Sequence, residues 1–306
     1  MLPIHQVDRR RAEAVEPLGT KRKFWFTEND RRILFKAEER GTGEDWAEVI
    51  ACHLCELLCL PHVHYEWAEE WDGNTYVQPG VVCETCAPAP ISLILGNQLL
   101  LERDPAYPAE ERKYRVPEHT VGAVADVVRR LAMPAHQWMK GVPSSIGSAL
   151  EVFVGYILLD AWIANQDRHH ENWAALRQGE ELRLAPTYDH GASLARNISD
   201  TERKDRLGTK DQRRTVGHFA GRARSALYGD RNDAKPLGTL EAFLAFARLA
   251  PAAARVWLDN LAGITAEAIQ AILAEVPPKR MSKIAKTFTL ELLVQNQQRI
   301  LREKVG

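Results

Sequence analysis

The sequence predicts an α+β protein of two lobes, with a small β-rich N-lobe that contains one helix and a larger, mainly helical C-lobe. Runs typical of β-strands are concentrated before residue 88, and longer apolar-periodic runs typical of helices follow it. The chain has 306 residues, about the size at which one hydrophobic core stops growing, which favours two lobes with a cleft between them. We therefore expect an N-lobe over residues 1–88 and a C-lobe over residues 89–306.

The predicted N-lobe follows the order strand, strand, helix, strand, strand. Turn-forming residues at 28–30 and 72–74 separate the runs of strand-forming residues. The helix begins after Gly43, carries acidic residues in its first turn, where the helix dipole favours them, and stops before Pro61. The expected elements are strands at 23–27 and 32–36, a helix from residue 43 to about residue 60, and strands at 62–67 and 75–83.

The predicted C-lobe contains one exception to its helical character. Residues 173–177 and 181–185 flank a turn centred near Gly179 and predict a short hairpin. The stretch 197–238 is polar and basic with scattered glycines, and we expect it to be the most mobile segment. The expected helices cover roughly residues 117–132, 144–165, 239–247, 251–260, 264–275 and 282–303.

The charge balance excludes a global attraction to polyanions, because 40 basic residues stand against 41 acidic ones. We therefore expect no direct nucleic-acid binding. The longest apolar run, 152–164, is interrupted by Gly155 and Asp160 and is shorter than the roughly 20 residues that a bilayer requires. It predicts a buried helix. The polar N-terminus has no apolar stretch of the secretory kind, so no membrane association and a cytoplasmic location are expected.

The five cysteines include two pairs with the spacing of a structural zinc site, Cys52 with Cys55 and Cys83 with Cys86. The core interpretation is stronger, because Cys52, Cys55 and Cys59 recur at helical spacing within an apolar-periodic segment, where thiols behave as small hydrophobic groups. An odd count in a cytoplasmic chain also disfavours a disulfide framework.

The candidate chemistry lies around the predicted hairpin of the C-lobe. Asp167 and Asn172 are five residues apart, the spacing at which a protein-kinase catalytic loop presents a base and a Mg²⁺ ligand to the same phosphate. The hairpin turns near Gly179, almost midway between Asn172 and Asp189, so folding it returns Asp189 to Asn172. These two side chains form an oxygen-rich pair suited to a hard cation, and the segment 189–191 takes the place of the metal-binding Asp-Phe-Gly element.

A cation for the nucleotide phosphates is also expected, normally a strand lysine paired with a helix carboxylate. Lys36 ends the second predicted strand, and Glu48 lies one turn into the following helix. The alternative is an exposed lysine and a solvated glutamate. A phosphate-covering loop would contain Gly19 and the basic residues up to Lys23, although a solvated basic turn remains open for this segment.

These residues resemble the HipA-like serine/threonine kinase family. The resemblance rests on D-R-H-x-x-N from Asp167 to Asn172, on Y-D-x-G at 188–191, on the F-K strand end and on the G-x-x-x-K loop. It implies a protein-kinase-like fold that uses ATP and Mg²⁺. Asp167 would then be the catalytic base, Asn172 and Asp189 would ligate Mg²⁺, and Lys36 would hold ATP. The loop would be braced by His169, while Arg168 and His170 are expected at the surface.

The resemblance further implies a protein substrate and a toxin of a toxin–antitoxin system. Longer members carry an additional N-terminal subdomain, which we expect to be absent here, so the short, HipT-like form matches better, with an antitoxin or a separate subdomain-like protein as partner. The family's regulatory serine before the loop glycine is absent, because Glu16, Pro17 and Leu18 occupy that stretch, unless Thr20 replaces it. D-R-H-x-x-N also occurs in phosphatidylinositol kinases, so a lipid or small-molecule kinase, or a silent nucleotide-binding module, remains an alternative. Hydrolytic metal chemistry at Asp167, His169 and His170 ranks last, because a third group of ligands is missing.

Overall fold

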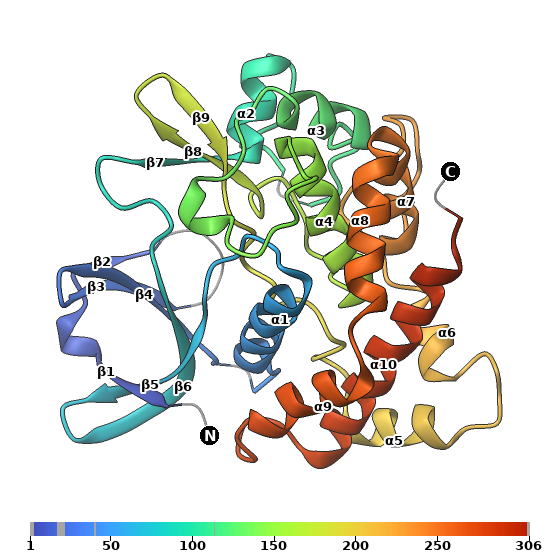
Figure 1. The fold of residues 1–306 in the computed structure, drawn as a ribbon. Coiled ribbons are helices and arrows are strands. Elements are labelled where there is room, and N and C mark those ends of the chain that lie inside the picture. The colour runs from blue at the N-terminus through green and yellow to red at the C-terminus, as the bar shows by residue number, and fades with distance from the viewer. Residues whose placement is uncertain (1–2, 17–21, 40, 113, 305–306) are drawn as a thin grey trace.

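The computed structural model describes residues 3–16, 22–39, 41–112 and 114–304, and it has two sheets and a helical lobe (Figure 1). The larger sheet has the strand order β1-β5-β6-β4-β3-β2, with β1 parallel to β5 and the other pairs antiparallel. Its strands are β1 (Ile4–Asp8), β2 (Ala14–Val15), β3 (Lys23–Glu28), β4 (Arg31–Ala37), β5 (Glu66–Asp72) and β6 (Thr75–Glu84). This β-rich half beside a helical half confirms the predicted fold class.

The hairpin of β3 and β4 forms where the sequence predicted it. Asn29 and Asp30 both adopt positive φ, 50° and 59°, as a two-residue turn that matches the strand twist requires. Phe24 and Phe35 lie opposite each other and are buried in a small core on one face of the sheet. Because side chains alternate along a strand, Lys36 points to the opposite face, toward the helical lobe.

Helix α1 (Glu44–Leu58) packs against that second face of the sheet. It begins after Gly43, at φ 82°, and ends two residues earlier than predicted because Cys59 adopts a left-handed conformation, at φ 58°. The strand predicted at 62–67 lies further along the chain, as β5. Residues near His62 form instead an isolated bridge to Thr187 of the C-lobe.

The helical lobe surrounds α4, which is buried on nearly all sides and corresponds to the predicted buried helix. All six predicted helices are present, and three were not expected: α2, and α5 and α6 within the polar stretch 197–238. The helices are α2 (Gly96–Arg103), α3 (Val121–Val128), α4 (Ala149–Trp162), α5 (Asp200–Gly208), α6 (Val216–Ala220), α7 (Thr239–Leu249), α8 (Pro251–Ala262), α9 (Ala266–Glu275) and α10 (Lys283–Arg302). Within the described ranges, none of them combines the length and apolar character needed to cross a membrane.

A second, three-stranded sheet lies beside α2, above the larger sheet in the view of Figure 1. It consists of the predicted hairpin, β8 (Ala174–Gln178) and β9 (Glu181–Leu184), and of β7 (Ser92–Leu95), which pairs antiparallel with β8. Its third strand, β7, was not predicted.

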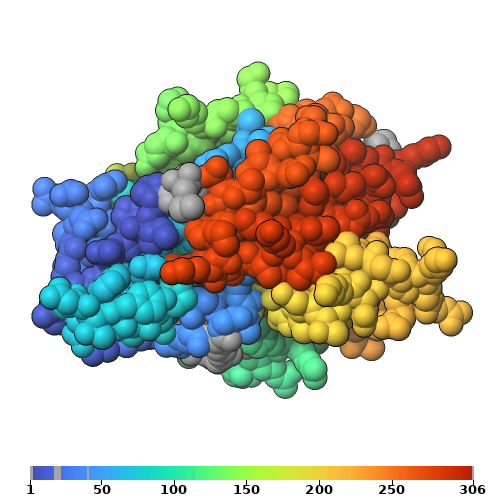
Figure 2. Space-filling view, turned by 90° about the horizontal axis from the view of Figure 1, so that it is seen from below, coloured from blue at the N-terminus to red at the C-terminus, as the bar shows by residue number. Residues whose placement is uncertain are grey.

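Arg280, between α9 and α10, fastens the C-terminal helices to the N-terminal half. Its guanidinium donates to Asp45 Oδ2 at 2.6 Å and to the backbone oxygen of Ala68 at 2.7 Å. Figure 2 shows the C-terminal helices, in orange and red, covering the junction with the sheet from below. The two halves therefore meet over an ion pair that is almost fully buried.

Candidate active site

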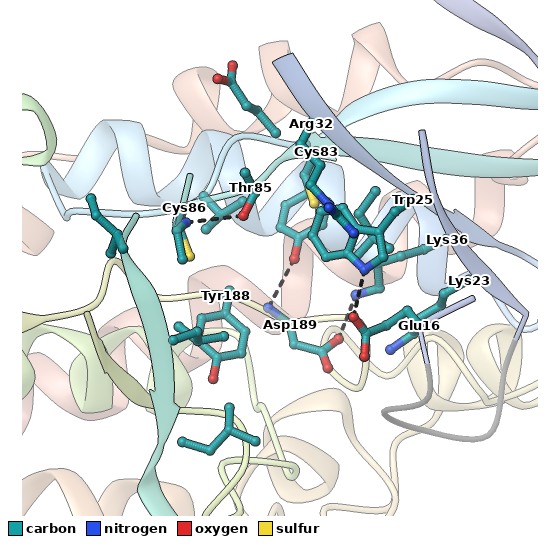
Figure 3. A pocket seen from close by; sticks show the side chains of 18 of the residues that line it. Glu16, Lys23, Trp25, Arg32, Lys36, Cys83, Thr85, Cys86, Tyr188 and Asp189 are labelled. Atoms are coloured by element: carbon teal, nitrogen blue, oxygen red, sulfur yellow. Dashed lines mark hydrogen bonds and ion pairs between the residues drawn. The ribbon is translucent and has the colours of Figure 1, made fainter. Parts of the chain in front are cut away.

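A cavity of about 490 Å³ lies between the larger sheet and the three-stranded sheet (Figure 3). In the view of Figure 3, Lys23, Lys36 and Asp189 gather on one side of it, whereas Thr85 and Cys86 lie on the other. The remaining lining residues include apolar side chains from both sheets and from the segment between them. They are Glu16, Trp25, Arg32, Leu34, Val63, Tyr65, Cys83, Glu84, Ala87, Ala89, Ile91, Leu93, Leu95, Glu171, Asn172 and Tyr188.

Lys36 joins the two halves at the wall of this cavity. Its Nζ forms an ion pair with Glu48 of α1 and a second one with Asp189 Oδ1 at 2.7 Å. Burial opposes the charged forms, but Lys36 holds the pKa of Asp189 well below its usual value, and Asp189 and Glu48 raise the pKa of Lys36. The lysine and Asp189 are therefore both charged at neutral pH.

Asp189 is fixed by its backbone as well as by this ion pair. It adopts positive φ, 58°, and its N–H donates to the hydroxyl of Tyr65 at 3.3 Å. The next N–H, of His190, donates to Glu48 Oε2 at 2.8 Å. One carboxylate of α1 thus holds both the lysine and the backbone beside Asp189, so the position of the helix sets the geometry of the site.

The loop after α4 is anchored by a buried ion pair. Arg168 is only 1% exposed and donates to both carboxylate oxygens of Asp160, at 2.7 and 2.8 Å. Its third contact is with the backbone oxygen of Asn172, at 2.7 Å. The expectation that Arg168 lies at the surface is wrong, because its guanidinium ties the end of the loop to the helix before it.

Asp167, His169 and Asn172 lie together in this loop. Asn172 Nδ2 donates to the backbone oxygen of Asp167 at 2.7 Å, and His169 Nδ1 accepts from the N–H of Glu171 at 3.1 Å. The Nε2 of His169 lies 3.7 Å from Asp167 Oδ1. Asn172 lines the cavity, and Asp167 is not among the lining residues. The loop therefore places Asn172 at the wall of the cavity and Asp167 outside the cavity lining.

His170 was also expected at the surface, and this is wrong as well. It is 1% exposed, and its Nδ1 lies 2.8 Å from the hydroxyl of Tyr107, while its backbone oxygen accepts from Asn97 N at 2.9 Å. Burial of His170 removes it from any site shared with solvent.

The other predicted site residues divide into two groups. Lys23 lies opposite Lys36 on the neighbouring strand and lines the cavity, and burial lowers its pKa. Gly19 falls outside the described residues, as does Thr20. Sequence reasoning missed Tyr65 and the buried ion pair between Asp160 and Arg168. A signal for this ion pair was present, since a charge inside an apolar helix requires a partner, and Arg168 follows eight residues later.

A small β-rich half, a helical half and a cavity between them define the kinase-like class of fold. Residues 98–284, more than half of the chain, match the family model of the HipA-like C-terminal domain, so the chain belongs to the HipA-like family. The proinflammatory kinase CtkA of Helicobacter pylori is similar over 98% of this chain and 96% of its own, with TM-score 0.69 and 19% identity.

The toxin HipA of Shewanella oneidensis, solved with HipB and its operator DNA, is similar over 95% of this chain and 67% of its own. The TM-score is 0.56 and the identity 11%. A search of the curated proteins found no match. These likenesses confirm the fold and, with the family match, the resemblance recognised in the sequence.

Proposed function

We propose that this protein transfers the γ-phosphoryl group of Mg·ATP to a serine or threonine hydroxyl of another protein. The observation that carries the proposal is the position of Lys36, which contacts Glu48 and Asp189 at one wall of the cavity. A lysine held in this way is a fixed cation for nucleotide phosphates. Phosphoryl transfer depends mainly on such positioning and on charge neutralisation.

The cavity supports nucleotide binding by its size and by its two unlike sides. Its volume is within the range of small-molecule sites. We place the phosphates of ATP beside Lys23 and Lys36, and its adenine ring between apolar side chains near Cys86 on the other side. The proposed lobe boundary at residues 88/89 falls within this second side, in the segment that links β6 to β7.

The residues fit a hard cation at the phosphate side. Because Nδ2 of Asn172 donates to a backbone oxygen, its Oδ1 is the atom that remains to face a cation, and Asp189 is ionised. Asn172 and Asp189 would hold Mg²⁺, which would neutralise charge on the transferred phosphoryl group. Asp167, outside the cavity lining, would accept the proton of the substrate hydroxyl, with His169 keeping the loop in shape.

A protein partner follows by analogy with the family. Since HipA of Shewanella oneidensis was solved with HipB, we propose that a small antitoxin-like protein, or a separate protein equivalent to the family's N-terminal subdomain, binds this chain. The antitoxin, rather than this chain, would contact DNA. Co-purification of a tagged copy with the product of the neighbouring gene would test this partner.

Phosphotransfer can be tested with purified protein, radiolabelled ATP, Mg²⁺ and a cell lysate, followed by mass spectrometry of phosphopeptides. The wild type should label itself or a lysate protein, and Asp167→Ala should label neither. Asp259→Ala, at an exposed position of α8, is the matched control and should behave like the wild type. Equal labelling by wild type and Asp167→Ala would refute the proposal. Phosphorylated metabolites or lipids without any phosphopeptide would refute its protein-kinase form.

A further inference from the structure

We propose that Cys52, Glu56, His62 and His64 form a binding site for a transition-metal ion, with Zn²⁺ as the ion that fits best. One ligand atom from each of the four residues lies within 4.8 Å of the others. The site is separate from the cavity, whose lining contains none of the four. It also differs from the paired-cysteine pattern of the sequence, since only Cys52 belongs to it.

The local structure explains why these four side chains meet. Cys52 and Glu56 are four residues apart on α1 and therefore share one face of the helix. The left-handed Cys59 ends α1 and reverses the chain. His62 and His64 follow on the returning segment, two residues apart, so in an extended chain their side chains point to the same side. The face of the helix and the face of the returning segment meet at the thiol.

The distances between ligand atoms suit tetrahedral coordination. His64 Nδ1 lies 3.3 Å from Cys52 Sγ and 3.5 Å from Glu56 Oε1. Zinc bonds of about 2.0 Å to nitrogen or oxygen and about 2.3 Å to sulfur, at tetrahedral angles, separate such atoms by about 3.3–3.5 Å. One thiolate, two imidazoles and one carboxylate are all ligands that Zn²⁺ accepts, and the soft thiolate disfavours Mg²⁺ and Ca²⁺.

Two of the ligands are oriented by further hydrogen bonds, as in known metal sites. His62 Nδ1 donates to the backbone oxygen of Leu60 at 2.7 Å, which leaves its Nε2 for the ion. Glu56 Oε2 accepts from His53 Nδ1 at 2.9 Å, which leaves Oε1 on the side of His64. A chance cluster of polar side chains would not require such outer partners.

The Cys52 thiol is buried, whereas the other side of the cluster faces solvent. The Cys52 thiol forms the buried side of the cluster, with its Sγ 3.3 Å from His64 Nδ1. Cys55, one turn away in the same helix, is fully buried and is not part of the cluster. His64 and Glu56 are exposed, so an ion can enter from the surface.

Direct metal binding tests the site without reference to kinase activity. The protein is stripped with a chelator and titrated with Zn²⁺ in competition with a chromophoric chelator, and the bound metal is counted by mass spectrometry. We expect one tightly held Zn²⁺ per chain. His64→Gln should weaken binding by at least about 100-fold, and His53→Gln, an outer partner, by about 10-fold. Cys59→Ser is the matched control and should bind like the wild type.

Spectroscopy with Co²⁺ identifies the sulfur ligand. The wild type should show a thiolate-to-cobalt charge-transfer band and the strong visible absorption of a tetrahedral ion, and Cys52→Ser should lose the charge-transfer band. If Cys52→Ser does not fold, the loss of zinc affinity in the exposed His64→Gln variant decides. A wild type that binds no Zn²⁺ more tightly than His64→Gln overturns the proposal, as does a cobalt spectrum without sulfur ligation.

Discussion

Replacing Asp160 by asparagine should destabilise the protein and disable the loop that carries Asp167. The substitution keeps the shape of the side chain but removes the charge that pairs with Arg168, which makes two hydrogen bonds to this carboxylate at a fully buried position. Breaking a buried pair costs about 3–5 kcal/mol, because the remaining charge is left without compensation. An unfolding entropy of about 2.1 cal/mol/K per residue over the 306 residues converts this into a decrease in Tm of about 5–8 °C.

Activity should fall as well, on the proposed function. Arg168 also donates to the backbone oxygen of Asn172, so a shift of its guanidinium moves the end of the loop as well. A displacement of the order of 1 Å costs about 100-fold in rate. Tm is measured by differential scanning calorimetry, and phosphotransfer is measured well below the lower Tm. Asp126→Asn is the control, because its ion pair with Arg129 is exposed and should contribute less than about 1 kcal/mol. If both variants lose the same small amount of stability, the ion pair between Asp160 and Arg168 does not support the loop.

Other predictions concern the pH dependence of stability and the packing of α4. Burial lowers the pKa of His119 to about 3, and its Nε2 accepts from Trp173 Nε1, so the folded state keeps it neutral. The free energy of unfolding should therefore decrease as pH falls through the pKa of histidine in the unfolded state, about 6.5, by about 1.4 kcal/mol between pH 7.5 and 5.5. In urea unfolding, His119→Phe should lack this part of the pH dependence. A Cβ added at Gly155 would lie 2.6 Å from Leu60 Cδ2, so Gly155→Ala should cost about 1–3 kcal/mol in urea unfolding. Gly122→Ala, in α3, would meet only Thr120 Oγ1 at 4.0 Å and should be neutral or stabilising. Equal costs for both variants would contradict the packing argument.

The sequence predicted those parts of the fold that depend on local patterns. The β3–β4 hairpin and the hairpin of β8 and β9 have strand-forming runs around turn residues, and α4 has a nearly continuous apolar run. The pairing of β1 with β5 was missed because it joins segments about 60 residues apart, and no local signal specifies such a partner. The strand predicted at 62–67 failed for a related reason, since the extended segment near His62 pairs with the C-lobe instead of the sheet.

The candidate site was predictable in its residue types but not in its contacts. Spacing brought Lys36, Glu48 and Asp189 into one hypothesis, and the structure places these three side chains together. The burial of Arg168 was not predicted, because a charged residue in a polar loop is usually exposed unless it has a buried partner. That partner lies in the preceding helix. The cluster at Cys52 was not predicted, because the helical spacing of the cysteines favoured a thiol buried in the core.

Both proposed sites depend on one stripe of α1. Glu48, Cys52 and Glu56 follow each other at intervals of four residues, so they lie on the same face of the helix, the first at the lysine and the other two at the metal site. The returning segment that carries His62 is bonded to the C-lobe through Val63 N and Thr187 O, two residues before Asp189. An ion at Cys52 would therefore fasten α1 to the backbone that leads to Asp189. Coupling between two binding sites is reciprocal. If nucleotide binding moves α1 and so changes the affinity for the ion by some factor, the bound ion must change the affinity for nucleotide by the same factor.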